Sequence, residues 1–186
     1  AAICSCRVSG LEFEEIKDNL KYIKPPGRRF QFRGVWEEKQ VVDDYAHHPS
    51  EINATISMAR VIINSQKSIL PKQPKRLVLV FQPHRYSRTN NLLNDFSLAL
   101  GKADLVFLAP IYGAGEENIS GVNINLLASS IKGIYPNKKI FTSPDLERLK
   151  KTLKEKTLKD DLIVIMGAGD INKLSNSFKY ETEELE

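Results

Sequence analysis

Residues 76–89 of the chain read RLVLVFQPHRYSRT. The first six residues are nearly all apolar, a pattern typical of a central parallel strand that is covered on both faces. Polar residues follow directly, and a helical pattern comes after them. Because ligands of open α/β sheets bind beyond the carboxyl ends of the strands, this stretch predicts both a fold class and the position of a site.

Strands and helices alternate along the chain on both sides of this stretch. The pattern predicts strands at residues 29–33, 40–43, 76–81, 105–109, 139–142 and 162–166, with a turn around Gly34 joining the first two. It predicts helices at residues 49–64, 91–100, 125–132, 145–156 and 170–178. Such alternation indicates right-handed βαβ crossovers. The predicted fold is therefore α/β: a Rossmann-like, doubly wound, mostly parallel sheet with helices on both faces.

A short helical segment precedes this alternation. Apolar residues recur at helical spacing over residues 12–23, which predicts an amphipathic helix. The run KPPG at residues 24–27 ends it, because proline cannot continue a helix and biases the preceding residue to extended geometry. This run is the only convincing domain boundary in the sequence. We therefore expect residues 27–180 to form the main domain, with residues 1–26 as a helical remnant of another.

Both ends of the sequence suggest a piece of a longer protein. Residues 1–6 resemble the middle of an element rather than the beginning of a gene product. Residues 181–186 are acidic and polar, and we expect them to fray.

The composition is that of an ordinary intracellular globular protein. The 186 residues are 41% hydrophobic and 27% charged, which allows a normal core. The net charge of +4 mildly favours anionic partners, but the basic residues are scattered and form no aromatic-basic array for nucleic acid. Cys4 and Cys6 are awkward disulfide partners, so we expect reduced thiols. With no signal peptide and no long apolar run, we expect a cytoplasmic protein that does not bind membranes.

The run VVDDYAHHP, at residues 41–49, carries the first group of candidate site residues. One of Asp43 and Asp44 could cap the helix that follows, and a carboxylate at a strand end could instead accept hydrogen bonds from a ribose. We favour Asp44 for that second role. Adjacent histidines in an extended segment do not converge comfortably on one metal ion, so a zinc site is excluded. His47 or His48 is better suited to contact phosphate or substrate.

The second group, His84, Arg85 and Arg88, follows the buried strand in a polar loop. The two arginines are three residues apart, so even one loose turn brings both guanidinium groups to the same side. Arginine grips carboxylate or phosphate in a bidentate manner. The alternative is a solvated loop in which Arg85 forms a surface salt bridge.

Two glycine-containing runs follow later strands. The loop IYGAGEENISG, at residues 111–121, is either a lid or an ordinary strand-to-helix loop. The run GAGD, at residues 167–170, has Asn172 where a dinucleotide fingerprint needs its third glycine, so a tight strand-to-helix turn is the better interpretation. The phosphate-binding pattern G-x-x-x-x-G-K-[ST] is absent, so this sequence cannot hold ATP phosphates in that way.

Five motifs occur here in the order expected of a Mur ligase: GRRF at residues 27–30, DDYAHHP, FQPHRYSRT, IYGAGE and GAGDI. The chain resembles the C-terminal domain of this three-domain family, preceded by the tail of the central ATPase domain up to residue 26. The resemblance implies ATP-dependent amide formation in peptidoglycan synthesis. A carboxylate of UDP-N-acetylmuramate is phosphorylated to an acyl phosphate, which the amine of L-alanine attacks. ATP and Mg²⁺ would be held mainly by the central domain.

The resemblance also implies a role for each candidate residue. Arg85 and Arg88, with His84, would clamp the alanine carboxylate. Tyr45 and His47 would line the same pocket or reach the phosphates. Arg29 and Asp44 would contact the ATP ribose or adenine across a cleft between domains.

No residue of this sequence need be a covalent nucleophile or a metal ligand, and we expect the chain alone to be inactive as a ligase. The runner-up is a standalone nucleotide- or amino-acid-binding module without catalysis. A nucleic-acid-binding domain rests on the isoelectric point alone.

Overall fold

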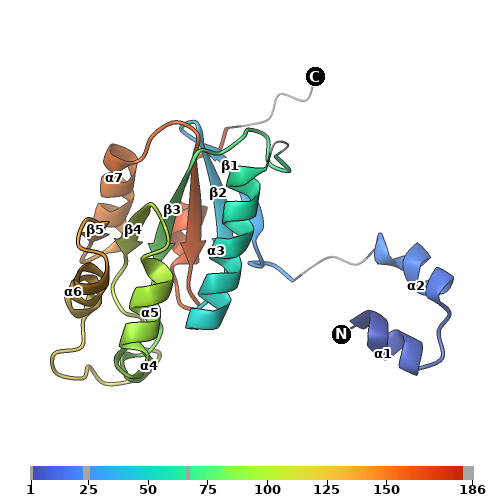
Figure 1. The fold of residues 1–186 in the computed structure, drawn as a ribbon, viewed down its shortest axis with the longest axis horizontal. Helices are drawn as coiled ribbons and strands as arrows, with labels where there is room; N and C mark the ends of the chain where they lie inside the picture. The colour runs from blue at the N-terminus through green and yellow to red at the C-terminus, as the bar shows by residue number, and fades with distance from the viewer. Residues whose placement is uncertain (1, 23–25, 66–67, 182–186) are drawn as a thin grey trace.

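The computed structural model describes residues 2–22, 26–65 and 68–181 (Figure 1). Within them, six strands form one sheet in the order β1-β2-β6-β3-β4-β5. The strands are β1 (Gln31–Trp36), β2 (Lys39–Asp44), β3 (Arg76–Phe81), β4 (Leu105–Leu108), β5 (Lys139–Thr142) and β6 (Asp161–Met166). β1 pairs antiparallel with β2, and all the other neighbours are parallel. The predicted mostly parallel α/β sheet is confirmed.

Helices cover both faces of the sheet. One apolar cluster joins α3 (Pro49–Asn64), α5 (Leu93–Leu100) and α6 (Ile124–Ile134) to the first face. A second cluster joins α7 (Leu146–Lys156) and α8 (Asn172–Asn176) to the opposite face. β3 supplies both clusters, since Leu77 and Leu79 belong to the first and Val78 and Val80 to the second. The continuous apolar run in β3 therefore has the expected cause, burial on both faces.

The N-terminal segment forms α1 (Ala2–Val8) and α2 (Phe13–Leu20), which pack on each other. Figure 1 shows this pair apart from the sheet. The helix predicted over residues 12–23 is thus shorter at its end, with a turn at residues 21–22. Residue 23 of that prediction, and residues 24–25 of the boundary predicted at residues 24–27, lie outside the described residues.

The turn predicted at Gly34 was wrong. Gly34 lies inside β1 at a bulge, where the pairing with β2 shifts by one residue. It has a φ of 137°, and a Cβ there would lie 2.9 Å from the ring of Tyr180. The chain turns instead at Glu37 and Glu38, both with positive φ. Gly34 is therefore required by a close approach rather than by a turn.

The helix predicted over residues 91–100 is observed as α5 (Leu93–Leu100), and a helix that the sequence did not predict lies before it. A short α4 (Tyr86–Asn91) comes first, and α5 begins after Leu92. Arg88 therefore lies on a helix, whereas the sequence predicted a loop. The terminal helix predicted over residues 170–178 is shorter, because the chain turns before α8 begins.

Tyr180 and Glu181 are held on the sheet. The Tyr180 hydroxyl donates to Ser175 O (2.8 Å), and Glu181 N donates to Val35 O (2.8 Å). The remainder of the predicted frayed tail, residues 182–186, lies outside the described residues. Of the helices in the described ranges, none has the length and apolar character needed to cross a membrane.

Candidate functional site

The carboxyl ends of four neighbouring strands, β2, β6, β3 and β4, deliver their loops to one edge of the sheet. A cavity of about 550 Å³ opens at this edge. Its lining includes all five residues predicted to bind substrate: Tyr45, His47, His84, Arg85 and Arg88. β6 lies between β2 and β3 although it is last in sequence, so the cavity lies at a topological switch point. The structure brings these residues together, and their role in binding remains a prediction.

Two polar atoms at this cavity are buried and unpaired. Among the described residues, Arg88 Nη1 and His84 Nδ1 are the buried side-chain nitrogen or oxygen atoms without a hydrogen-bond partner. Burial, and next the neighbouring Arg88 guanidinium, lower the pKa of His84 below its ordinary value of 6.5. The ring is therefore neutral at pH 7, and Arg88 supplies the cation. Buried polar groups in folded proteins are rarely left unpaired, so the pair is suited to an anion that brings acceptor oxygens.

Arg85, by contrast, already has a partner. Its Nη1 lies 3.4 Å from Glu116 Oε1, and its side chain is about half exposed. Glu116 also accepts hydrogen bonds from the backbone N (3.0 Å) and hydroxyl (2.6 Å) of Ser87. These bonds from Ser87 lower the pKa of Glu116, which is therefore ionised at neutral pH. The two arginines of the predicted clamp thus stand in different electrostatic states.

The loop after β4 holds the loop after β3 in place. Arg85 N donates to Tyr112 O (2.8 Å), and Tyr112 N donates to Pro83 O (2.9 Å). The rings of Tyr112 and His84 stack with centroids 5.5 Å apart. Arg85 itself has a φ of 75°, unusual for a residue with a side chain, and these contacts fix that geometry.

Sequence reasoning missed Tyr112 and Glu116 as site residues. Both belong to the IYGAGE run. The available sequence signal for a role of these residues was that the run occurs in the expected order among the five motifs. Gly115 takes a φ of 84°, and a Cβ on Gly113 would lie 3.1 Å from the ring of Tyr86. The glycines therefore allow the loop to present Glu116 to the start of α4.

Tyr45 and His47 form the wall contributed by β2. Their rings meet edge to face at 5.4 Å, and the His47 ring lies 6.0 Å from that of His84. His47 Nδ1 lies 3.0 Å from Tyr45 O and 3.3 Å from Glu51 Oε2. These contacts fix the orientation of the imidazole, whose remaining nitrogen Nε2 is the one left for a ligand.

His48 has a different task from its neighbour. Its Nδ1 accepts from Ser50 N (3.4 Å), and the side chain of Glu51 completes a capping box at the start of α3. The interpretation of Asp43 or Asp44 as the cap of this helix was therefore wrong. Four residues, 45–48, separate the end of the strand from the start of the helix, so residues 43 and 44 are too far from its first turn to cap it.

Arg29 and Asp44 meet at a second, smaller hollow of about 260 Å³, which also involves Thr55 and Met58. The carboxylate of Asp44 accepts hydrogen bonds from Phe30 N (2.7 Å) and Ala46 N (2.7 Å). These bonds hold Asp44 rigidly beside the larger cavity. The Arg29 guanidinium lies over the ring of Tyr45, 5.7 Å from its centroid, so Tyr45 separates the two hollows.

Asp43 is a structural residue. Its carboxylate is buried and lies 3.2 Å from Arg28 Nε. Burial raises the pKa of Asp43, although Arg28 opposes the shift. Arg28 also donates to Gly167 O (2.5 Å), so the pair ties the start of β1 to the loop after β6.

The GAGD run forms the predicted tight strand-to-helix turn. A Cβ on Gly167 would lie 2.9 Å from Gln82 O, and one on Gly169 would lie 2.5 Å from Gln82 Oε1. Gln82 in turn bonds Asp170 Oδ1 (2.9 Å) and Ile171 N (3.0 Å). The glycines therefore allow close packing of this turn on the end of β3. Within the described ranges, His, Cys, Asp and Glu form no group of three that could hold a metal ion.

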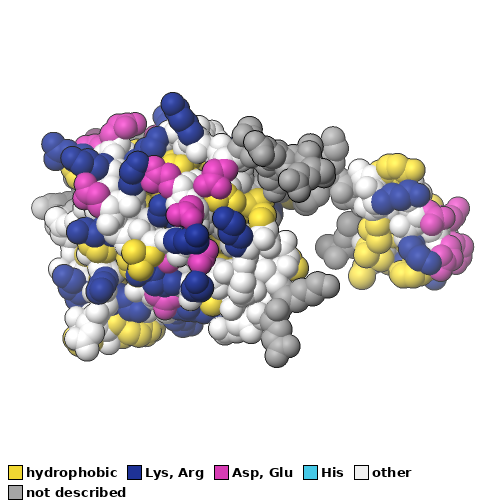
Figure 2. Space-filling model, turned by 90° about the horizontal axis from the view of Figure 1, so that it is seen from above, with side chains coloured by type: hydrophobic (Ala, Val, Ile, Leu, Met, Phe, Trp, Pro, Cys, Tyr) yellow, Lys and Arg dark blue, Asp and Glu magenta, His cyan; other side chains and the backbone are white. Residues whose placement is uncertain are grey.

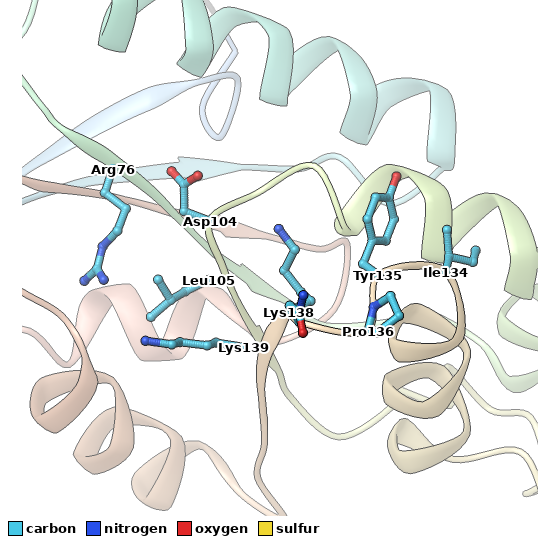
Figure 3. A pocket seen from close by; sticks show the side chains of 9 residues that line it. Arg76, Asp104, Leu105, Ile134, Tyr135, Pro136, Lys138 and Lys139 are labelled. Atoms are coloured by element: carbon cyan, nitrogen blue, oxygen red, sulfur yellow. The ribbon is translucent and has the colours of Figure 1, made fainter.

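A cavity of similar size, about 570 Å³, lies at the opposite edge of the sheet and is lined by Arg76, Asp104 and Lys138, among others (Figure 3). Arg76 makes two bonds to the buried Asp161, of 2.8 and 2.6 Å. Asp104 accepts two from Arg60, of 2.8 and 2.9 Å. Figure 2 shows this edge from above, with cationic and anionic side chains interspersed and no histidine in view. Arg76 and Asp104 are thus each paired with an opposite charge at this edge.

Comparisons with known proteins agree with this architecture. Residues 28–169 match the family described as "Mur ligase, glutamate ligase domain". UDP-N-acetylmuramate--L-alanine ligase of Prochlorococcus marinus (strain MIT 9313) is 52% identical over 174 residues, which are 94% of this chain and 36% of that protein. The enzyme of the same name from Synechococcus sp. (strain CC9311) is 52% identical over 181 residues, 97% of this chain and 38% of that protein.

Solved structures give the same result. The crystal structure of UDP-N-acetylmuramate-alanine ligase from Thermotoga maritima matches with a TM-score of 0.70 and 25% identity. The match covers 95% of this chain and 34% of that one. The chain thus spans little more than a third of the length of the relatives it matches.

Proposed function

This chain belongs to the Mur ligase family, and from that premise we propose that it is the amino-acid-binding C-terminal domain of an ATP-dependent ligase that joins L-alanine to UDP-N-acetylmuramate. The names of the two relatives at 52% identity support this substrate pair. Since the chain spans 36–38% of their length, the activity is that of the longer protein. The chain alone is expected not to catalyse ligation.

The observation that carries the proposal is the pair of unpaired buried nitrogens, Arg88 Nη1 and His84 Nδ1, at the cavity. A carboxylate supplies two acceptor oxygens, which matches the fork geometry of a guanidinium. The free amine of the same amino acid would then point away from the clamp. That orientation is what amide formation requires, because the amine is the nucleophile.

The chemistry assigns this chain a positioning role. A carboxylate is a poor electrophile, so the UDP-sugar carboxylate must first be activated as an acyl phosphate. Holding the amine close to that group, and aligned with it, converts an encounter of two molecules into a step within one complex. Arg88 and His84 would fix the carboxylate end of L-alanine, Arg85 would border it from its ion pair with Glu116, and Tyr45 and His47 would line the remaining wall.

ATP is the phosphoryl donor of such a reaction, and the residues of this chain are suited to contact only one part of the ATP molecule. The sequence lacks the phosphate-binding loop, and the described residues contain no cluster of metal ligands. The phosphates and Mg²⁺ would therefore be held by the rest of the protein. Arg29 and Asp44, at the smaller hollow beside Tyr45, are suited to contact the ribose or adenine.

Residues 1–26 are proposed to be the tail of the central ATPase domain. The support is the exposed apolar surface of α1, α2 and the segments that adjoin them: Val8 is 90% exposed, Phe13 53% and Tyr22 72%. Apolar patches of this kind mark surfaces that another part of the protein covers. An enzyme that consumes ATP and a UDP-sugar is expected in the cytoplasm, where such metabolites occur.

Recognition of the carboxylate can be tested by comparing L-alanine with L-alaninamide. The amide keeps the amine but lacks the negative charge of the carboxylate. NMR titration of the histidine ring signals of the full-length ligase measures both. We expect L-alanine to shift the His84 signals and to leave those of His48 unchanged, since His48 caps α3 away from the cavity. L-Alaninamide should bind at least tenfold more weakly, because charged hydrogen bonds contribute about 1.5–3 kcal/mol each. Equal binding of the two compounds would contradict the proposal.

A further inference from the structure

Glu116 stands at the rim of the site without belonging to the predicted clamp. It comes from the loop after β4 and reaches the N-terminus of α4, where it accepts two hydrogen bonds from Ser87. Its third contact is the ion pair with Arg85, and its side chain is only 23% exposed. α4 has no cap from its own side chains, so Glu116 takes that role from a distant loop. A carboxylate is thus built into the protein beside a guanidinium that lines the cavity.

The charges at the cavity therefore do not sum to two free cations. Arg85 is paired with Glu116, and His84 is neutral at pH 7 because burial and Arg88 lower its pKa. Among the described residues that line the cavity, Arg88 offers the buried cationic donor that has no partner. One free cation matches a ligand that carries one carboxylate.

We propose that Glu116 is a specificity-determining residue, which engages Arg85 and thereby restricts the site to amino acids with an uncharged side chain. The inference rests on the proposed function of this cavity. An acidic amino acid would bring a second carboxylate close to Glu116, where no free cation remains to pair with it. The two neighbouring carboxylates repel each other, and this repulsion weakens the binding of an acidic amino acid relative to alanine.

Size alone does not give this selectivity within the chain. The cavity of about 550 Å³ is in the range that accommodates drug-sized ligands, far larger than alanine. L-Aspartate differs from L-alanine by one carboxylate and would fit the same space. Charge is therefore the property by which this part of the protein can distinguish them.

The test is Glu116→Gln in the full-length ligase, with kcat/KM measured for L-alanine and for L-aspartate. Glutamine keeps one oxygen that can accept from Ser87 and loses the negative charge, which frees Arg85 for a second carboxylate. We expect the ratio of kcat/KM for aspartate over alanine to rise by about tenfold, the effect of one charged pair of moderate strength. The matched control is Glu117→Gln, the same charge change at the exposed neighbouring residue, which should leave the ratio unchanged.

Two further measurements make the result decisive. Thermal unfolding of the Glu116→Gln protein establishes that it is folded, and the double variant Arg85→Gln with Glu116→Gln should lose the gain for aspartate. If Glu116 only braces α4, the single variant lowers both kcat/KM values together, and an unchanged ratio overturns the inference. In that case a raised KM for alanine in an Arg88 variant still supports the proposed function. An alanine KM that is unchanged when Arg88 is replaced rejects the clamp itself.

Discussion

The two edges of the parallel sheet carry cavities of nearly equal volume, about 550 Å³ at the carboxyl ends of the strands and about 570 Å³ at the amino ends. Both contain arginine side chains. At the amino edge, Arg76 is bonded through two nitrogens to Asp161. At the carboxyl edge, Arg88 Nη1 and His84 Nδ1 are buried without partners.

The difference indicates which cavity is built for a ligand. A buried polar group that is already paired is part of the structure, whereas an unpaired one carries a desolvation cost that an incoming hydrogen-bond partner can offset. Volume and the number of charges do not separate the two edges. The two edges differ in whether their buried polar groups already have partners. This difference predicts opposite consequences for substitutions at the two edges.

The largest effect is expected for Arg88→Met in the full-length ligase. Loss of a charged hydrogen bond to the substrate should raise the alanine KM and lower kcat/KM by about 100-fold, from about 3 kcal/mol. Stability should change little, because Nη1 has no partner to lose. Steady-state kinetics with varied alanine and urea unfolding measure the two effects. Arg88→Lys, which keeps the charge without the planar fork, should lie between wild type and Arg88→Met.

Arg76→Met, at the opposite edge, should show the reverse. It leaves the carboxylate of Asp161, only 2% exposed, without its cation. We expect the free energy of unfolding to fall by about 2–3 kcal/mol, less than for a fully buried pair because Arg76 is partly exposed. The alanine KM should not change. Urea unfolding measures the loss, and addition of Asp161→Asn should recover part of it; a raised alanine KM would contradict the contrast between the edges.

Much of the fold could be predicted from the sequence. β3 and α3 were predicted at their observed residues, because an unbroken apolar run and a helical stripe after Pro49 are strong local signals. α4 was missed because its sequence, YSRTNN, has no apolar periodicity. It is held in part by Glu116, a residue outside its own segment. Gly34 misled the prediction because a close approach to Tyr180, distant in sequence, needed the glycine.

The site residues were predictable, but their states of pairing were not. The polar runs that follow β2 and β3 predicted that His47, His84 and both arginines lie at one edge of the sheet. Yet Arg85 pairs with a residue 31 positions away, and Arg76 pairs with one 85 positions away. Such pairs depend on the register of strands and on loop geometry. No local pattern could show which arginine is free.

The adjacent histidines repeat the contrast between the two edges on a smaller scale, within the site itself. His48→Ala removes the cap of α3 and should lower the free energy of unfolding by about 1 kcal/mol, without changing the alanine KM. His47→Ala should instead raise the alanine KM, because His47 lines the cavity. Thermal unfolding and alanine kinetics of both variants provide the comparison. Equal effects of the two substitutions on KM would show that the cavity wall extends to His48.

The smallest effect is a dependence of the free energy of unfolding on pH, which we expect from His84 at the carboxyl edge. His84 follows β3 and lies at the carboxyl edge. Burial and Arg88 lower the pKa of His84, so below pH 6.5 the unfolded chain binds more protons than the folded one. The contribution of His84 to stability is therefore fully present above pH 6.5 and is lost as the pH falls towards the folded pKa. A bound carboxylate favours the protonated ring and raises the pKa of His84 in the folded protein. The pH range over which stability is lost therefore becomes narrower when alanine is bound. Urea unfolding from about pH 5 to 8, with and without alanine, should show this in the wild type and not in His84→Gln. Identical pH profiles for the two proteins would mean that the His84 ring is not constrained by burial beside Arg88.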